Sequence, residues 1–126
     1  MSAEDISKLY ENLSDEDLTQ LLVADYEVTQ AILSAYPEMA QDAGFELFDA
    51  SWAKRYWRSI AAEITGIKAS DKLLSWAVGA TISGTASLLI TYFGLPAVAF
   101  SSAVALAIII LRAAKNASKP AEKPAA

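Results

Sequence analysis

The feature that most constrains this chain is a run of 39 residues, Leu73 to Leu111, that contains no charged side chain. As one continuous helix the run would measure about 58 Å, whereas the hydrocarbon core of a bilayer is about 30 Å thick. Gly94 and Pro96 lie near its midpoint, where glycine permits a positive φ and proline prevents simple continuation of a helix. The run therefore predicts a hairpin of two apolar helices, 73–92 and 96–112, with a turn near 93–96.

Basic residues flank this hairpin, and they predict its orientation. Lys68 and Lys72 precede the first apolar helix, and Arg112, Lys115 and Lys119 follow the second. Because the turn itself is uncharged, the positive-inside rule predicts a multi-pass protein of the inner (cytoplasmic) membrane with both termini in the cytoplasm. The second helix offers only about 22 Å of strongly apolar length, so crossing would require Arg112 to extend toward the headgroups, the bilayer to become thinner, or the turn residues to enter the apolar core. A buried core of a soluble or oligomeric protein is the alternative.

Residues 1–72 predict a small, acidic head of about four amphipathic helices. An apolar face at helical spacing begins at Ile6, and a long second helix is expected from about Asp15 to about Ala35, with Ser14 as its N-cap. A weaker helical segment follows at 38–50, and another helix is expected near 51–66. The fold class expected is therefore all-α, a helical head followed by a two-helix transmembrane hairpin at 73–111.

Charge is distributed unevenly along the chain. Residues 1–72 contain fourteen acids and six bases, a net charge of −8, whereas 112–126 contain four bases and one acid, a net charge of +3. The acidic head excludes nucleic-acid binding and leaves a protein partner as a possibility, because phosphate contacts need clustered bases. The tail 112–126 is predicted to be basic and disordered. The N-terminal residues have acids where a cleavable signal peptide has a basic region, so no such signal is expected.

Catalysis has no candidate residues in this sequence. The chain has no cysteine and no histidine, which removes disulfides, thiolate metal sites and the commonest metal ligand and general base. Nucleotide-binding loops, nucleophile elbows and metal-binding motifs are also missing from the sequence. We therefore expect a protein that is not an enzyme and that has no catalytic, metal or cofactor residues.

One face of the first apolar helix combines small and hydroxyl-bearing residues at steps of four. This ridge consists of Ser75, Gly79, Ser83, Ser87 and Thr91. In a bilayer, such a ridge favours close helix packing or self-association, and Ala99, Ala103 and Ala107 give the second helix a matching ridge of small residues. The alternative is that Ser83, Ser87 and Thr91 line water in an oligomeric pore.

The segment "SWAKRYWRS" interleaves aromatic and basic residues on the helix expected near 51–66. The residues concerned are Trp52, Lys54, Arg55, Tyr56, Trp57 and Arg58. Tryptophan and tyrosine favour the headgroup level and bases attract anionic lipid, which predicts an interfacial anchor on the cytoplasmic leaflet. The alternative is an ordinary helix whose aromatics pack on the first two helices and whose bases pair with acids.

Residues 57–111 resemble the hydrophobic hairpin region of pore-forming colicin domains. The resemblance rests on "YWRSIAAEITG" followed by the uncharged "LLSWAVGATISGTASLLITYFGLPAVAF" with its Gly and Pro turn. It implies insertion of the hairpin into a membrane and permeabilisation. Colicin domains surround their hairpin with more helices than we expect here, so we expect this head to be too small to shelter two apolar helices in a monomer.

These observations predict a non-enzymatic bacterial membrane protein whose hairpin self-associates to permeabilise or remodel the bilayer, as a toxin, holin-like protein or defence effector would. The expected partners are the lipid bilayer and further copies of the chain. One alternative is a membrane-anchored adaptor whose acidic head binds a protein. Another is a soluble oligomer that uses the hairpin as a shared core.

Overall fold

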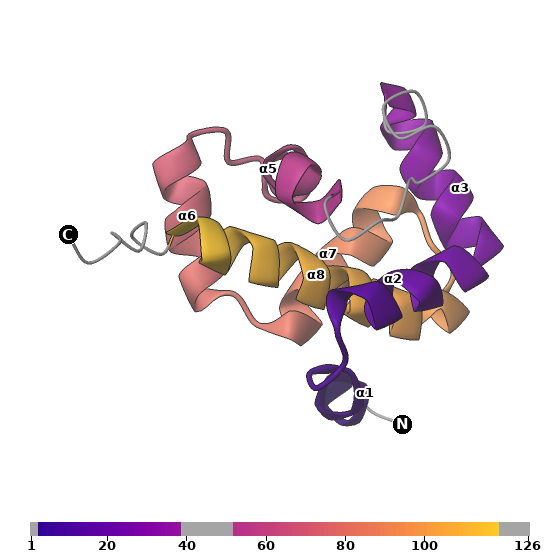
Figure 1. Ribbon diagram of the computed structural model, residues 1–126. Helices are drawn as coiled ribbons and strands as arrows, with labels where there is room; N and C mark the ends of the chain where they lie inside the picture. The colour runs from indigo at the N-terminus through magenta and orange to yellow at the C-terminus, as the bar shows by residue number, and fades with distance from the viewer. Residues whose placement is uncertain (1–2, 39–51, 119–126) are drawn as a thin grey trace.

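The computed structural model describes residues 3–38 and 52–118, and these ranges contain helices and no strands (Figure 1). The prediction of an all-α fold is therefore confirmed. The helical segment expected at 38–50 falls almost entirely outside the described residues. The elements are α1 (Ala3–Tyr10), α2 (Asp15–Ala24), α3 (Tyr26–Ala35), α5 (Trp52–Thr65), α6 (Ser70–Gly79), α7 (Ile82–Phe93), η1 (Ala97–Ala99) and α8 (Phe100–Ser118).

The prediction of a single helix over 15–35 is wrong, because the chain forms two helices there, α2 and α3, separated by Asp25. Ser14 caps α2 as predicted, since its Oγ accepts a hydrogen bond of 3.1 Å from the Asp17 N–H. At Asp25 the backbone is extended and its N–H donates to the Leu22 carbonyl at 3.1 Å, which closes α2. Its Oδ1 accepts from the Val28 N–H at 3.3 Å and so begins α3. One aspartate thus ends one helix and starts the next.

The first apolar helix is also divided, into α6 and α7, which corrects the continuous helix expected over 73–92. Ala80 and Thr81 have extended backbones between the two elements. Thr81 Oγ1 accepts from the Gly84 N–H at 3.0 Å, which caps α7. Because Gly79 also weakens the end of α6, a cap and a poor helix former together outweigh the apolar pattern.

The turn predicted near 93–96 is confirmed. Gly94 has φ of 61° and ψ of 38°, a left-handed conformation that favours glycine at the end of a helix. The Leu95 N–H donates to the Ile90 carbonyl at 3.0 Å, and the Gly94 N–H donates to the Thr91 carbonyl at 3.4 Å. This pair of bonds is the Schellman motif, and Pro96 follows it directly.

Helix α8 lies in the centre of the fold, and α1, α2, α5, α6 and α7 all pack on it (Figure 1). Every residue from Ala103 to Leu111 is at most 3 % exposed. The expectation that the head is too small to shelter the apolar segment is therefore wrong for α8. The reason is that only α8 is enclosed on all sides, whereas α7 remains at the surface. The helices of the expected head and those of the expected hairpin share one core around α8.

The C-terminal end of α8 differs from the sequence prediction in length. The helix continues past Arg112 to Ser118, so 112–118 are helical instead of belonging to a disordered tail. Its 19 residues measure about 28 Å, longer than the apolar length expected after Pro96. Residues 119–126 of that tail lie outside the described range.

Candidate functional site

Helix α8 is the element with the clearest functional potential. Together with η1 it forms a 21-residue segment, Ala97–Ala117, that is long and apolar enough to cross a membrane by length and composition. It is the one such segment in the described part of the chain, and α7 is apolar but shorter. In its most apolar window 72 % of the residues are buried inside the fold. A central core helix of a water-soluble protein has the same properties, so its polar contacts are informative.

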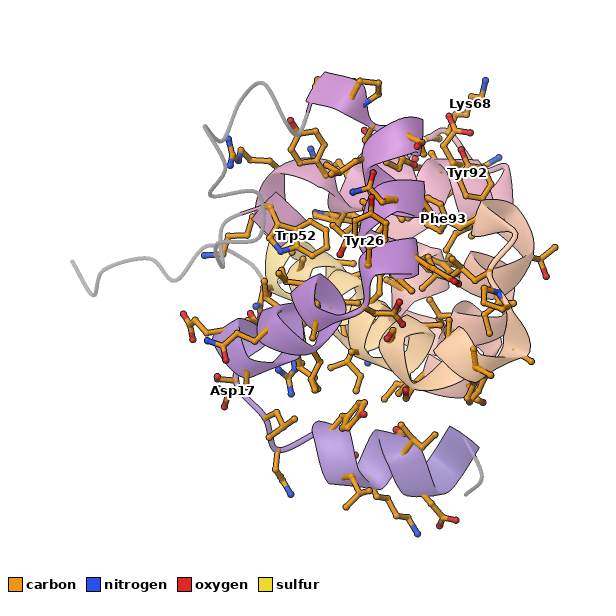
Figure 2. All side chains as sticks on the ribbon, turned by 90° about the vertical axis from the view of Figure 1, so that its right-hand side faces the viewer. Asp17, Tyr26, Trp52, Lys68, Tyr92 and Phe93 are labelled. Atoms are coloured by element: carbon orange, nitrogen blue, oxygen red, sulfur yellow. The ribbon has the colours of Figure 1, made fainter. Side chains whose placement is uncertain are left out.

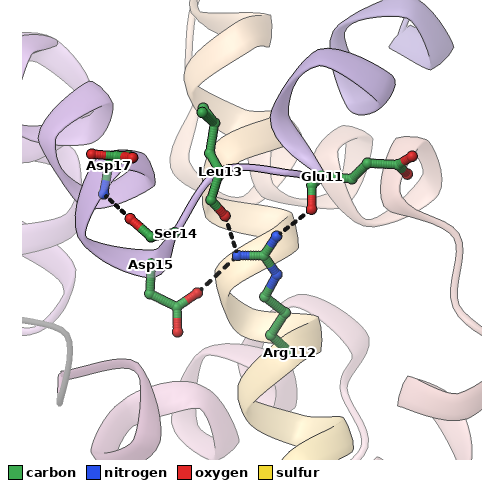
Figure 3. A network of polar contacts seen from close by, with 6 residues as sticks. All are labelled: Glu11, Leu13, Ser14, Asp15, Asp17 and Arg112. Atoms are coloured by element: carbon green, nitrogen blue, oxygen red, sulfur yellow. Dashed lines mark hydrogen bonds and ion pairs between the residues drawn. The ribbon is translucent and has the colours of Figure 1, made fainter.

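Arg112 fastens the C-terminal half of α8 to the link between α1 and α2 (Figure 3). One guanidinium nitrogen donates to the Leu13 carbonyl at 2.8 Å and to Asp15 Oδ1 at 3.0 Å. The other terminal nitrogen donates to the Glu11 carbonyl at 2.7 Å. The planar guanidinium thus satisfies two carbonyls that follow α1 and one carboxylate that begins α2. Arg112 therefore contacts the N-terminal helices instead of extending toward a lipid headgroup.

A second polar contact holds the N-terminal half of α8. Ser102 is 8 % exposed, and its Oγ donates to Asp25 Oδ2 at 2.9 Å. The same carboxylate caps α3 through its other oxygen. Side chains near both ends of α8 are therefore bonded to aspartates that border α2.

The hydroxyl ridge predicted on the first apolar helix lies on the outside of α6 and α7. Ser75, Gly79, Ser87 and Thr91 are exposed and Ser83 is half-buried. Thr91 Oγ1 donates within its own helix, to the Ser87 carbonyl at 3.0 Å. The buried residues of α6 and α7 are instead Leu73, Ala77, Thr85, Ala86 and Leu89, so in this fold the ridge does not form the contact with α8.

The aromatic residues of α5 are buried, which differs from the interfacial placement predicted for them. Trp52, Tyr56 and Trp57 are 1 %, 9 % and 2 % exposed, and α5 packs along α8. Because aromatic side chains remove a large apolar area from water, α5 covers α8 as a core helix. The alternative reading is right that the aromatics are packed, although their main neighbour is α8.

The basic residues of the same segment point outward. Lys54, Arg55 and Arg58 are exposed, and within residues 3–38 and 52–118 none of them pairs with a carboxylate. Arg55 Cζ lies 5.9 Å from the centroid of the Tyr56 ring, and Arg58 Cζ lies 5.4 Å from that of Trp57. The pairing of these bases with acids is thus not seen in the described residues.

An aromatic cluster joins the ends of α3 and α7 near α5 (Figure 2). Phe93 stacks edge-on with Tyr36, at 6.4 Å between centroids, and with Tyr92, at 4.9 Å. The Tyr92 hydroxyl donates to Glu63 Oε2 at 3.3 Å. Burial, reinforced by the neighbouring Tyr92 and Glu63, raises the pKa of the Tyr36 phenol far above its usual value. The Tyr36 hydroxyl has no hydrogen-bond partner among the described residues.

A groove of about 470 Å³ lies where α1, α2, α3 and the start of α8 meet. Leu21, Tyr26 and Val98 give it exposed apolar walls, since they are 37 %, 73 % and 88 % exposed. Asp25 and Glu27 make it acidic. The groove therefore combines apolar and acidic side chains.

The described residues contain no group of three or more histidines, cysteines, aspartates or glutamates that could hold a metal ion. The sequence does not predict two residues that form polar contacts around α8, namely Asp15, which pairs with Arg112, and Ser102, which donates to Asp25. Asp15 lies among several acids at the start of α2, and Ser102 is a hydroxyl residue in an apolar run. Neither has a sequence signal that names its partner.

Compared with protein families, curated proteins and solved structures, the chain matches none of them. The resemblance to pore-forming colicin domains therefore stays a prediction.

Proposed function

We propose that this chain is a non-enzymatic, membrane-active protein that keeps α8 inside its own fold and delivers the α7–α8 hairpin to a bilayer. The observation that carries the proposal is the combination found in α8. It is long and apolar enough to span a membrane, and it is enclosed by shorter helices that pack against it and form a few polar bonds with it. In this view the protein is a toxin, holin-like protein or defence effector that permeabilises or remodels the bacterial inner membrane.

The exterior of α6 and α7 supports a membrane-bound state. The exposed side chains between Leu73 and Val98 include no charged residue, and Val78, Leu88 and Tyr92 among them are large and apolar. After insertion, the ridge Ser75, Gly79, Ser83, Ser87 and Thr91 would be free to pack against further copies or to line an aqueous path.

A second membrane crossing requires α6 and α7 to join. Helix α7 alone has 12 residues and measures about 18 Å, which is shorter than the apolar core of a bilayer. A continuous helix over 73–93 would be about 32 Å long and would span it. Lipid favours this change, because the unpaired backbone groups at the break near Thr81 cannot be hydrated there. The inserted hairpin would then have both termini on the cytoplasmic side.

An engineered disulfide tests whether α8 must leave the fold. The chain has no cysteine, and Asp25 and Ser102 are in contact, so Asp25→Cys with Ser102→Cys places the only two thiols side by side. We expect the oxidised protein to cause no leakage from vesicles and no carbonate-resistant binding, and reduction to restore both. The two single-cysteine variants, treated with the same oxidant, are the controls.

Equal leakage from the oxidised and reduced forms would show that α8 does not need to separate from α2 and α3. Leakage in neither form, with wild-type protein also inactive, would refute membrane permeabilisation. Two further variants, Ser83→Leu and Ser87→Leu, distinguish a water-filled pore from insertion without a pore. Both changes should abolish leakage and leave integration intact if these hydroxyls line the path.

The second candidate function is an adaptor whose acidic groove binds a protein partner. It is favoured by the exposed Tyr26 and Val98 beside Glu27 in that groove. Tyr26→Ala should then abolish activity in cells, while vesicle leakage by the purified variant stays unchanged. If the protein instead acts on the membrane, Tyr26→Ala should change cellular activity only as far as it changes vesicle leakage.

A further inference from the structure

The exposed side of α5 is a cationic surface on a chain whose net charge is negative. This α5 basic face consists of Lys54, Arg55 and Arg58, within a protein of net charge −5. Within the described ranges none of the three pairs with a carboxylate. Three exposed bases gathered on one helix face create a local positive potential, which is complementary to an anionic surface.

The orientation of these cations is fixed by the buried residues beneath them. Tyr56 and Trp57 point into the core, 9 % and 2 % exposed, and the basic residues on either side of this pair therefore face solvent. The two arginines rest near the rings of these aromatics, at 5.9 and 5.4 Å from Cζ to centroid. Contact with a ring restricts each guanidinium and leaves its donors available at the surface.

An apolar recess lies directly beside this face. A groove of about 270 Å³ is lined by Lys54 and Trp57 of α5 and by Ala113, Asn116 and Ala117 of α8. An ammonium group next to an apolar recess matches the phosphate and glycerol region of a lipid more closely than it matches a soluble anion.

We propose that the α5 basic face docks this protein onto the surface of an anionic lipid bilayer before α8 is released. The inference rests on the proposed function, because it names the lipid class at which that function begins. Since α5 packs along α8, a bilayer bound to the outer side of α5 lies one helix away from the apolar segment that would enter it (Figure 1).

The aromatic residues have a different role from the one predicted for an interfacial helix. In the docked state only the cations contact headgroups, because the tryptophans are already buried against the core. Docking is therefore electrostatic and reversible by salt, with a contribution that falls off within a Debye length of the surface.

The test compares binding of wild-type protein to vesicles of phosphatidylcholine alone and to vesicles that also contain phosphatidylglycerol. Replacing Lys54, Arg55 and Arg58 together by glutamine should lower partitioning onto the anionic vesicles about 100-fold, since each base near the surface contributes about fivefold. The matched control replaces the exposed Lys8, Lys68 and Lys72 by glutamine, which changes the net charge equally. This control should retain most of the binding. Far-UV circular dichroism checks that both variants keep their helical content.

Unchanged binding of the α5 variant, or equal binding of wild-type protein to both kinds of vesicle, would overturn the inference. Salt-dependent self-association that the α5 variant loses, without vesicle binding, would also overturn it and would assign the face to the acidic helices of a second copy. Binding to anionic vesicles that is followed by no leakage would refute the proposed function and leave the docking surface standing. Leakage that does not depend on lipid charge would refute the docking surface and leave the proposed function standing.

Discussion

Arg112 should contribute more to stability than any other exposed or half-exposed charge in the described chain, because its guanidinium makes three hydrogen bonds. These bonds, of 2.7 to 3.0 Å, go to the carbonyls of Glu11 and Leu13 and to Asp15. The Arg112 side chain is 30 % exposed and that of Asp15 is 39 % exposed, so water screens part of the interaction. We assign about 1 kcal/mol to each bond, which is less than a buried hydrogen bond of a charged group contributes. Arg112→Ala should therefore lower the free energy of unfolding by about 3 kcal/mol.

The carboxylate is expected to be the smaller part of this contribution. An exposed ion pair contributes about 0.5 kcal/mol, so Asp15→Asn should destabilise the protein only by about that amount. Arg112→Lys should be intermediate, because an ammonium group keeps the charge and cannot reach both carbonyls with a planar fork. The measurement is urea unfolding followed by far-UV circular dichroism. With a slope of about 1.5 kcal/mol per M, Arg112→Ala should lower the midpoint by about 2 M.

Lys72→Ala is the matched control, an exposed cation with no hydrogen bond of this kind, and it should change stability by less than about 0.5 kcal/mol. If Arg112→Ala and Asp15→Asn lower the free energy of unfolding by the same amount, the ion pair and not the carbonyl contacts would hold α8 to the α1–α2 link. If Arg112→Ala falls within the range of the control, these bonds do not stabilise the enclosed state of α8. Either result would refute the reasoning.

Three further changes test single features of the fold. Burial raises the pKa of Tyr36, so the unfolded state loses the phenol proton at a lower pH than the folded state, and stability should fall as pH rises above about 10. Unfolding measured at several pH values should show that Tyr36→Phe removes part of this fall and that the control Tyr26→Phe does not. Gly94→Ala should cost about 1 kcal/mol, because Gly94 has a positive φ, whereas Gly79→Ala should be neutral or stabilising; a thermal melt that ranks them the other way would contradict the turn geometry. Thr81→Ala should cost about 1 kcal/mol through loss of the α7 cap, and an unchanged urea midpoint would show that the break between α6 and α7 does not depend on it.

Local signals in the sequence predicted the local structure where one residue type determines the backbone. Ser14 caps α2, and Gly94 with Pro96 forms the turn before α8, both as expected. The breaks at Asp25 and Thr81 were missed, although both are residue types that cap helices, because each lies within an otherwise continuous apolar pattern. Periodicity reports which face is apolar and is insensitive to an interruption of one or two residues.

The packing around α8 could not be predicted from the sequence, because it depends on which helix faces which. An uncharged helix satisfies two environments equally well, a bilayer and the centre of a bundle, and composition does not distinguish them. The count of covering helices pointed to a bilayer under the assumption that both apolar helices need shelter. In the structure only α8 is sheltered from water, and the surrounding helices are sufficient to enclose it. The partners of Arg112 and Ser102 follow from that arrangement and are separated from them by long stretches of sequence.

Burial explains the lack of charge in one half of the apolar run and not in the other. In α8 a charge between Ala103 and Leu111 would be desolvated, so its exclusion follows from the fold. On α6 and α7, positions such as Ser75, Ser87 and Thr91 are exposed, and a lysine or glutamate there would cost little and would favour solubility. The folded state in water therefore does not account for the uncharged exterior between Leu73 and the end of α7. A state in which this exterior leaves water does account for it, and this supports the function proposed for the chain beside the length and burial of α8.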